Sequence, residues 1–221
     1  VIDVGCGGGH FLEAMTELAP DARVAGHELP GDHIGGLRAR GLDVYDVPLD
    51  AIPERFSAVV LLDVAEHVRD PNLLFRQCRA LLHDRGFIYV HTPRRCLWDT
   101  LFLAMVRVPG LRGLAQAWLR TRISVGHLHL WSDDALRRSL ERAGFEVLVL
   151  RPEFELSFPL DTYIRRHLAR WVPLRESTLA VISRAARVVF VDLRTLRNKA
   201  ICVARPREAA RARAVPERLG A

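Results

Sequence analysis

The amino-acid sequence predicts an α/β fold built on a doubly wound parallel sheet with helices on both faces. Three observations lead to this prediction. A glycine-rich turn follows the first apolar segment, short apolar segments then alternate with segments of helical period, and residues 56–62 are almost continuously apolar. Such a continuous run is typical of a strand that is covered on both faces of a parallel sheet. At 221 residues, the chain suits one domain with a sizeable core.

The first half of the chain contains five segments that we predict to be strands, because each is short and rich in β-branched or other apolar residues. Helices are predicted between them from apolar residues at helical spacing, and Pro71 is a start signal for the last of these helices. In chain order, the predicted elements are strand 1–4, helix 11–18, strand 23–28, helix 34–40, strand 42–46, strand 56–62, helix 73–82 and strand 86–93.

The turn after the first strand indicates which ligand the fold binds. Its pattern is D-x-G-x-G-x-G, with Asp3 followed by Gly5, Gly7 and Gly9. Glycine lets a backbone approach a ligand closely and adopt positive φ angles. A dinucleotide-binding turn has the pattern G-x-G-x-x-G, but here the third glycine comes one residue early and His10 stands in its place. The Gly-Lys-Ser/Thr sequence of a phosphate-binding P-loop does not follow either.

The D-x-G-x-G-x-G pattern resembles motif I of the class I S-adenosylmethionine-dependent methyltransferases. This resemblance implies that S-adenosylmethionine is the cofactor. It also implies that the turn holds the methionine part of that cofactor, a zwitterion without phosphate. The residues to which this role is carried over are Asp3, Gly5, Cys6, Gly7 and Gly9.

Further cofactor-binding residues are predicted at the ends of later strands. Glu28 ends the second strand, and a carboxylate at that place can accept hydrogen bonds from both ribose hydroxyls. The alternative for Glu28 is a solvated loop acid. The resemblance implies in addition that Asp46 and Val47 contact the adenine edge and that Asp63 lies beside the sulfonium.

A second segment narrows the resemblance to one subgroup. Residues 66–71 have the pattern E-H-V-x-D-P, which resembles the ubiquinone-biosynthesis O-methyltransferases and related small-molecule and glycan-cluster methyltransferases. The subgroup implies a Rossmann-like sheet of seven strands, mostly parallel with an antiparallel last strand. It assigns residues 136–147 to a helix and the sixth strand, and residues 198–204 to the antiparallel strand. The resemblance covers residues 1–93, 126–151 and 197–205.

Two histidines are candidates for the general base that takes the proton of the acceptor. They are His67 and His127, since an imidazole titrates near neutral pH. In some ubiquinone-type relatives an E-x-x-E-H motif carries a divalent metal, and its matching positions here are Asp63, Glu66 and His67. We favour an orienting role for Glu66 and His67 and predict no metal site. For Arg94, a surface position is favoured over contact with an anionic acceptor.

Two helical segments interrupt the resemblance, at about residues 96–125 and 159–197. Both have apolar residues on one side and arginine on the other, which indicates lid helices over the acceptor pocket. The alternative is peripheral contact with the inner face of the membrane. The net charge is +6, but no nucleic-acid-binding motif accompanies it, so nucleic acid is not an expected partner. Of the 32 basic residues only Lys199 is a lysine. This preference for arginine points to the composition of the genome.

The chain is expected to form one methyltransferase domain over residues 1–205, followed by a disordered tail over residues 206–221. It begins at motif I, so we expect its N-terminal part to be incomplete. Four widely spaced cysteines indicate free thiols in a cytoplasmic protein. The predicted activity is methyl transfer to an oxygen of a small-molecule, glycan or lipid-linked acceptor. The alternatives are an NAD(P)-binding Rossmann oxidoreductase and a non-catalytic module with the methyltransferase fold.

Overall fold

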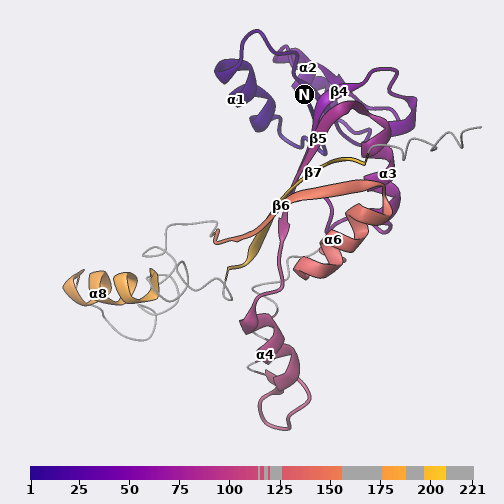
Figure 1. Ribbon diagram of the computed structural model, residues 1–221. Coiled ribbons are helices and arrows are strands. Elements are labelled where there is room, and N and C mark those ends of the chain that lie inside the picture. Colours follow the sequence, from indigo (N-terminus) through magenta and orange to yellow (C-terminus); the bar gives the residue numbers. More distant parts are fainter. Residues whose placement is uncertain (114, 117–118, 120–125, 156–175, 188–196, 208–221) are drawn as a thin grey trace, which may run out of the picture.

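Seven strands form a single sheet in the order β3-β2-β1-β4-β5-β7-β6 (Figure 1). The computed structural model describes the chain except for residues 114, 117–118, 120–125, 156–175, 188–196 and 208–221. The strands are β1 (Ile2–Val4), β2 (Ala25–His27), β3 (Val44–Tyr45), β4 (Phe56–Leu62), β5 (Leu82–Pro93), β6 (Phe145–Glu153) and β7 (Lys199–Pro206).

The pairing of the strands confirms the predicted mostly parallel sheet with an antiparallel last strand. β1 pairs with β2 and β4, β2 with β3, and β4 with β5, all in parallel. β7 inserts between β5 and β6 and runs antiparallel to both. It ends at Pro206, one residue past the predicted end of the domain.

Helices cover both faces of the sheet, as the sequence predicts. Figure 1 shows α1 (His10–Leu18) on one side and α3 (Pro71–Ala80) and α6 (Asp133–Arg142) on the other. A small apolar cluster joins α1 and α2 (His33–Ala39) to β3 through Leu12, Ile34, Leu37 and Val44. The larger cluster lies between the sheet and the α3–α6 pair and includes Phe75, Leu136 and Leu140, none of which is exposed to solvent.

Local capping explains where two of these helices begin. The Asp70 carboxylate accepts a hydrogen bond of 3.0 Å from the Leu73 amide, and Pro71 occupies the first helical turn of α3. The Ser132 hydroxyl caps α6 in the same way by accepting from the Ala135 amide at 3.2 Å. The start signal at Pro71 is thus confirmed, although α3 ends at Ala80, two residues before its predicted end.

β5 begins four residues earlier than the sequence predicts. The register between β4 and β5 shifts, because Phe56 pairs with Leu82 while Ala58 pairs with Phe87. The extra residues belong to β5, and the side chains at 83–85 are exposed. Their polar character resembles a turn, so the periodicity of the sequence does not reveal this irregular part of the strand.

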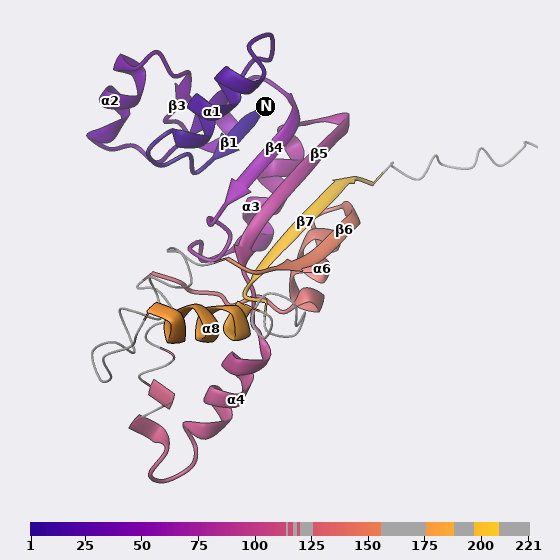
Figure 2. The ribbon, with the colours of Figure 1, turned by 90° about the vertical axis from the view of Figure 1, so that its left-hand side faces the viewer.

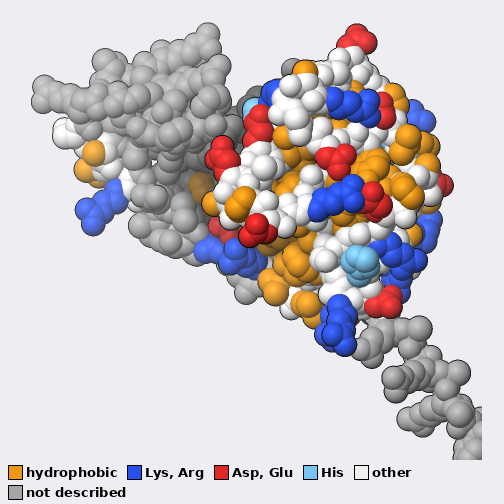
Figure 3. Space-filling model, turned by 90° about the horizontal axis from the view of Figure 1, so that it is seen from above, with side chains coloured by type: hydrophobic (Ala, Val, Ile, Leu, Met, Phe, Trp, Pro, Cys, Tyr) orange, Lys and Arg blue, Asp and Glu red, His pale blue; other side chains and the backbone are white. Residues whose placement is uncertain are grey.

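The two ends of the sheet differ in character. At the amino ends of the parallel strands, Arg23 forms ion pairs with Asp43 and Glu54, and the end of the molecule seen in Figure 3 carries basic and acidic side chains side by side. At the carboxyl ends, the chain leaves β1 toward β2 and leaves β4 toward β5, so it winds away from the β1–β4 pair in both directions. Open α/β sheets bind their ligands in the crevice at such a point.

Helices are present in both segments that interrupt the family resemblance. α4 (Leu97–Met105) projects beyond the end of β5, and α8 (Glu176–Arg187) lies beyond the same end of the sheet (Figure 2). Most of the segment 159–197 and almost the whole predicted tail lie outside the described residues. Within the part of the chain that is described, no helix has the length and apolar composition needed to cross a membrane.

Candidate functional site

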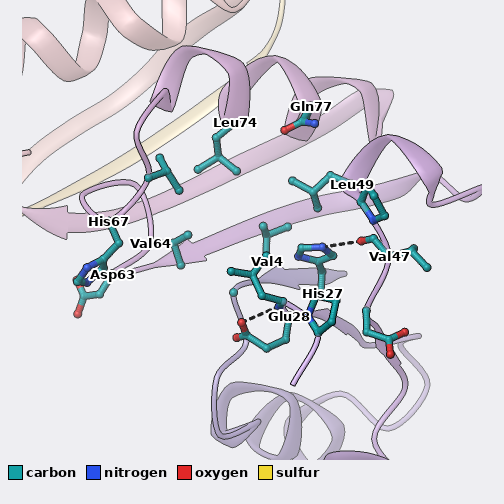
Figure 4. Close-up of a pocket in the computed structure, with 16 residues that line it drawn as sticks. Val4, His27, Glu28, Val47, Leu49, Asp63, Val64, His67, Leu74 and Gln77 are labelled. Atoms are coloured by element: carbon teal, nitrogen blue, oxygen red, sulfur yellow. Dashed lines mark hydrogen bonds between the residues drawn. The ribbon is translucent and has the colours of Figure 1, made fainter. Parts of the chain in front are cut away.

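A cavity of about 600 Å³ opens at the carboxyl ends of β1, β2 and β4. The strand ends, α3 and the segment 46–49 that follows β3 supply its walls (Figure 4). The site residues predicted from the sequence that line this cavity are Gly5, Glu28, Asp46, Val47, Asp63 and His67. The cavity therefore lies where the winding of the sheet places a ligand site.

The glycine loop is held against β2 by its backbone. The amides of Gly5 and Cys6 both donate to the carbonyl oxygen of His27, at 2.7 and 3.0 Å. Gly5 has a φ of 78°, and a Cβ atom there would lie 2.7 Å from the Val64 Cγ2 atom. Since an L-residue is strained at this φ and would also clash, glycine is required at position 5.

Glu28 links the end of β2 to the glycine loop. Its carboxylate accepts a hydrogen bond of 2.7 Å from the Gly7 amide and one of 2.8 Å from the Leu29 amide. Glu28 is also a wall residue of the cavity. A carboxylate has about four lone-pair sites, so two backbone bonds leave it able to accept from a ligand. This geometry disfavours the alternative of a freely solvated loop acid.

Asp3 is buried at the base of the loop and is only 2% exposed. Its Oδ1 atom has no hydrogen-bond partner in the described structure. Burial, together with the nearby charge of Glu28, raises the pKa of Asp3 to about 7. The folded chain therefore binds this proton more tightly than the unfolded chain, and the associated stability is lost as the pH rises from about 4 to about 7.

The remaining residues of the loop support it from behind and do not line the cavity. Cys6 is buried, burial raises the pKa of its thiol to about 11, and a Cβ atom on Gly26 would lie 2.7 Å from its Sγ atom. Gly9 packs against α2 and the turn after it, because a Cβ atom there would lie 2.6 Å from Leu42 Cδ1. The geometry gives both residues a structural role in shaping the loop.

Residues 46–49, which follow β3, form another wall of the cavity. The Asp46 carboxylate binds the Arg38 guanidinium at 2.7 Å, and Val47 is 39% exposed. The His27 Nε2 atom lies 2.9 Å from the carbonyl oxygen of Val47, so β2 and this segment are joined across the cavity wall (Figure 4). Burial lowers the pKa of His27, and its Nδ1 atom has no partner in the described structure.

Some wall residues have no motif that would identify them in the sequence. Leu74 and Gln77 lie one turn apart on α3, and Leu49 lies in the short helix η1 (Leu49–Ala51). All three belong to the cavity wall, as does His27, for which the sequence offers no motif. The only sequence signal for Leu74 and Gln77 is their i, i+3 spacing on α3. Any buried helix face has this spacing, so it does not identify a cavity wall.

Asp63 and Glu66, which the sequence groups in one candidate metal motif, have different partners. Asp63 contacts Lys199 and His91. Glu66 is fully buried, and its Oε2 atom accepts a hydrogen bond of 2.9 Å from the Thr92 hydroxyl. Burial raises the pKa of Glu66, and its Oε1 atom has no hydrogen-bond partner in the described structure.

The two candidate bases lie beside each other. The rings of His67 and His127 are 4.7 Å apart in an edge-to-face arrangement, and His67 Nδ1 lies 3.1 Å from the carbonyl oxygen of Gly126. One ligand atom from each of Glu66, His67 and His127 lies within 4.8 Å of the others. The amides of Leu128 and His129 both donate to the Glu66 carbonyl, which ties this loop to residues 126–129.

Arg94 does not occupy the predicted surface position, and His129 forms similar contacts within the fold. Arg94 is only 15% exposed and forms a bidentate ion pair with Asp133 at 2.5 and 3.0 Å, so it joins β5 to α6 instead of lying on the surface. The His129 Nε2 atom lies 2.9 Å from the carbonyl oxygen of Val68, and its ring packs near Trp131. These contacts give both residues a structural role.

Comparison with known proteins finds a matching family and several similar methyltransferases. The family model described as "Methyltransferase domain" matches residues 1–150. A ubiquinone biosynthesis O-methyltransferase of Bordetella avium is 30% identical over 156 residues, which are 66% of this chain and 61% of that protein. The protein of the same name from Proteus mirabilis is 24% identical over 180 residues, 76% of this chain and 72% of that protein. The chain thus spans less than two thirds of the Bordetella protein.

A solved structure of a SAM-dependent methyltransferase from Archaeoglobus fulgidus superimposes with a TM-score of 0.58. The alignment covers 92% of this chain and 84% of that chain at 19% identity. At this identity, the similarity supports the fold alone.

The packing of Gly9 generates a first prediction. A Gly9→Ala change should destabilise the fold by about 1–3 kcal/mol, since alanine is strained at its φ of 79° and its Cβ atom would contact Leu42. Gly36→Ala is the control: Gly36 is in α2 with open space around it, so alanine should be neutral or stabilise by about 0.5–1 kcal/mol. Urea unfolding followed by circular dichroism measures both, and equal effects would contradict the packing role of Gly9.

Proposed function

The chain belongs to the methyltransferase domain family, and from this we propose that it is a class I S-adenosylmethionine-dependent methyltransferase acting on an oxygen of a small-molecule, glycan or lipid-linked acceptor. The observation that carries the proposal is the joining of the glycine loop to Glu28 at the carboxyl ends of β1 and β2. This arrangement combines backbone amides with carboxylates, and it suits a cationic, ribose-containing ligand.

The proposed roles are those that the family resemblance implies, and contacts of these residues in the structure support them. The glycine loop and Asp3 hold the methionine part, and the unpartnered Asp3 oxygen is suited to the ligand's ammonium group. Glu28 accepts from the ribose hydroxyls. Asp46 and Val47 contact the adenine, whose faces can pack on apolar wall residues such as Leu49 and Leu74.

Methyl transfer needs alignment more than covalent catalysis. When bound, S-adenosylmethionine would supply an electrophilic methyl group to a lone pair of the acceptor oxygen and would leave as a neutral thioether that keeps the electrons of the broken carbon–sulfur bond. The proton of the acceptor hydroxyl goes to a base, for which His67 or His127 is proposed. The protein contributes by holding the two reactants in line and excluding water.

The Glu66–His67–His127 group is proposed to orient the loop above the cavity. Glu66 is fixed by Thr92 and by the amides of residues 128 and 129, which supports this role. The group differs from the candidate metal motif of the sequence, because His127 stands where Asp63 was expected. One carboxylate and two imidazoles form a donor set that suits a transition-metal ion better than magnesium.

Oxygen as the acceptor atom is supported by the names of the ubiquinone biosynthesis O-methyltransferase relatives. Contact with a membrane surface is supported by α4, where Leu97, Leu101 and Leu103 are each more than 40% exposed. A lipid-linked acceptor would be reached from such a surface. We also propose that the helical segments at about residues 96–125 and 159–197 act as a lid over the acceptor pocket.

Calorimetric titration tests the donor, and a labelling screen tests the acceptor. The protein should bind S-adenosylhomocysteine at micromolar concentration and should not bind NAD; the reverse result would favour the oxidoreductase. Radiolabelled S-adenosylmethionine is then offered with lipid, glycan and phenolic extracts. Label in a base-labile or ether product supports oxygen as the acceptor atom. Binding without transfer to any fraction would favour the non-catalytic module.

The ribose contact yields a second prediction. Glu28→Ala should weaken binding of S-adenosylhomocysteine by about 1–3 kcal/mol, because it removes the ribose acceptor and the partner of the Gly7 amide. Glu17→Ala on the exposed side of α1 removes the same charge elsewhere and should leave the affinity unchanged. Titration calorimetry measures both, and an unchanged affinity of Glu28→Ala would rule out the assignment.

Asp3 yields a pH-dependent prediction. With a pKa of about 7, its carboxyl is mostly protonated at pH 6, and binding of the ligand's ammonium group requires the proton to leave. The affinity for S-adenosylhomocysteine should therefore fall by about tenfold between pH 7.5 and pH 6.0. Asp3→Asn should bind more weakly and lose this pH dependence. Titrations across this range measure it, and parallel profiles of the two proteins would contradict the role of Asp3.

A further inference from the structure

Four titratable side chains form a closed ring of contacts beside the cavity. Asp63 follows β4, His91 lies in β5, Glu155 follows β6, and Lys199 begins β7. The Lys199 ammonium is 2.5 Å from Asp63 and 3.6 Å from Glu155. The His91 ring reaches the same two carboxylates, with Nδ1 3.3 Å from Asp63 and Nε2 3.1 Å from Glu155. Anionic and basic groups therefore alternate around the ring.

Exposure divides the ring into two levels. The side chains of Lys199 and His91 are 15% and 16% exposed, whereas those of Asp63 and Glu155 are 44% and 49% exposed. The basic groups thus lie against the sheet, and the carboxylates lie above them. Only Asp63 of the four is also a wall residue of the cofactor cavity.

Rigid strand pairing fixes the positions of the basic groups. In the antiparallel β5–β7 pair, His91 is opposite Ile201 and Pro93 is opposite Lys199, so both basic side chains are placed by the same ladder. Asp63 has a φ of 55°, a strained conformation for a residue with a side chain. Its contacts with Lys199 and His91 supply attractive energy that retains this conformation.

We propose that Lys199 and His91 are positioning residues that hold the Asp63 carboxylate toward the cofactor cavity, where it favours the cationic methyl donor over its neutral product. This inference rests on the proposed function. The donor carries a positive sulfonium and the product a neutral thioether, while the two are otherwise alike. A carboxylate fixed near the sulfur therefore strengthens binding of the donor alone.

A positioning role and a purely electrostatic role of Lys199 predict opposite changes in the ratio of the affinities for donor and product. The inference can therefore be tested. If Lys199 positions Asp63, then Lys199→Met releases the carboxylate, and the affinity for S-adenosylmethionine falls relative to S-adenosylhomocysteine. If Lys199 acts only as a positive charge near the ligand, its removal favours the cationic donor and the ratio rises. A purely structural role changes both affinities equally.

The experiment measures both affinities by titration calorimetry on the full chain. Asp63→Asn and Lys199→Met should each lower the donor-to-product affinity ratio by about threefold to tenfold. Lys199→Arg should restore the ratio, and Lys199→Met should have no further effect in the Asp63→Asn background. Arg205→Met, which removes one positive charge near the other end of β7, is the matched control and should leave the ratio unchanged.

A second pair of variants keeps the test decisive if Lys199→Met does not fold. His91→Leu removes the other contact of Asp63 and should lower the ratio, while His91→Asn keeps a donor near the Nδ1 position and should preserve it. A ratio that rises or does not change in the folded Lys199 and His91 variants overturns the inference. If the unmodified protein binds neither ligand, the proposed function itself fails, so the two failures are distinguishable.

Discussion

The side-by-side parallel pairing of β1 and β4 is the constraint on which the site depends. Ile2 pairs with Val59 and Asp3 with Val60, and the chain then winds away from this pair in both directions. Because the chain leaves the two strands in opposite directions, a crevice forms between the loops that follow them. The glycine loop emerges on one side of this crevice and Asp63 on the other. The Gly5–Val64 contact shows how closely the two loops approach, because even one added carbon atom would not fit between them.

The carboxylates on the two sides of the crevice have different surroundings. On the β1–β2 side, burial and the nearby charge of Glu28 raise the pKa of Asp3. Glu28 accepts from two backbone amides, whereas one Asp3 oxygen has no partner in the described structure. On the β4–β5 side, Lys199 and His91 lower the pKa of Asp63 although burial opposes this shift. On the first side a buried carboxylate oxygen is thus left for a group of the ligand, whereas on the second side basic groups of the protein hold the carboxylate in place. A ligand with a separate ammonium and sulfonium matches this difference.

The parts of the fold and site that could be predicted from the sequence are those set by local pattern. The glycine loop, Glu28 and the start signal at Pro71 depend on a few neighbouring residues, so the sequence alone locates the loop and Glu28 at strand ends and Pro71 at the start of α3. The early start of β5 was missed because a register shift with β4 draws polar residues into the strand. Lys199 and His91 could not be related to Asp63, since their contacts depend on the register of β7 against β5 over a long separation in sequence. Arg94 was assigned to the surface for the same reason, because its partner Asp133 lies on a distant helix.

The ring also connects the donor cavity to the segment between β6 and β7. Asn198 donates to the Glu155 carbonyl at 2.7 Å and accepts from the Glu155 amide at 2.9 Å, so the two ends of that segment are clamped together. Glu155 and the adjacent Lys199 both belong to the ring that holds Asp63. The base of the segment and the wall of the cavity are therefore fixed relative to each other through charged contacts and strand pairing. In-line transfer tolerates little misalignment between donor and acceptor, so a rigidly held wall beside Asp63 suits the methyl transfer proposed for this cavity.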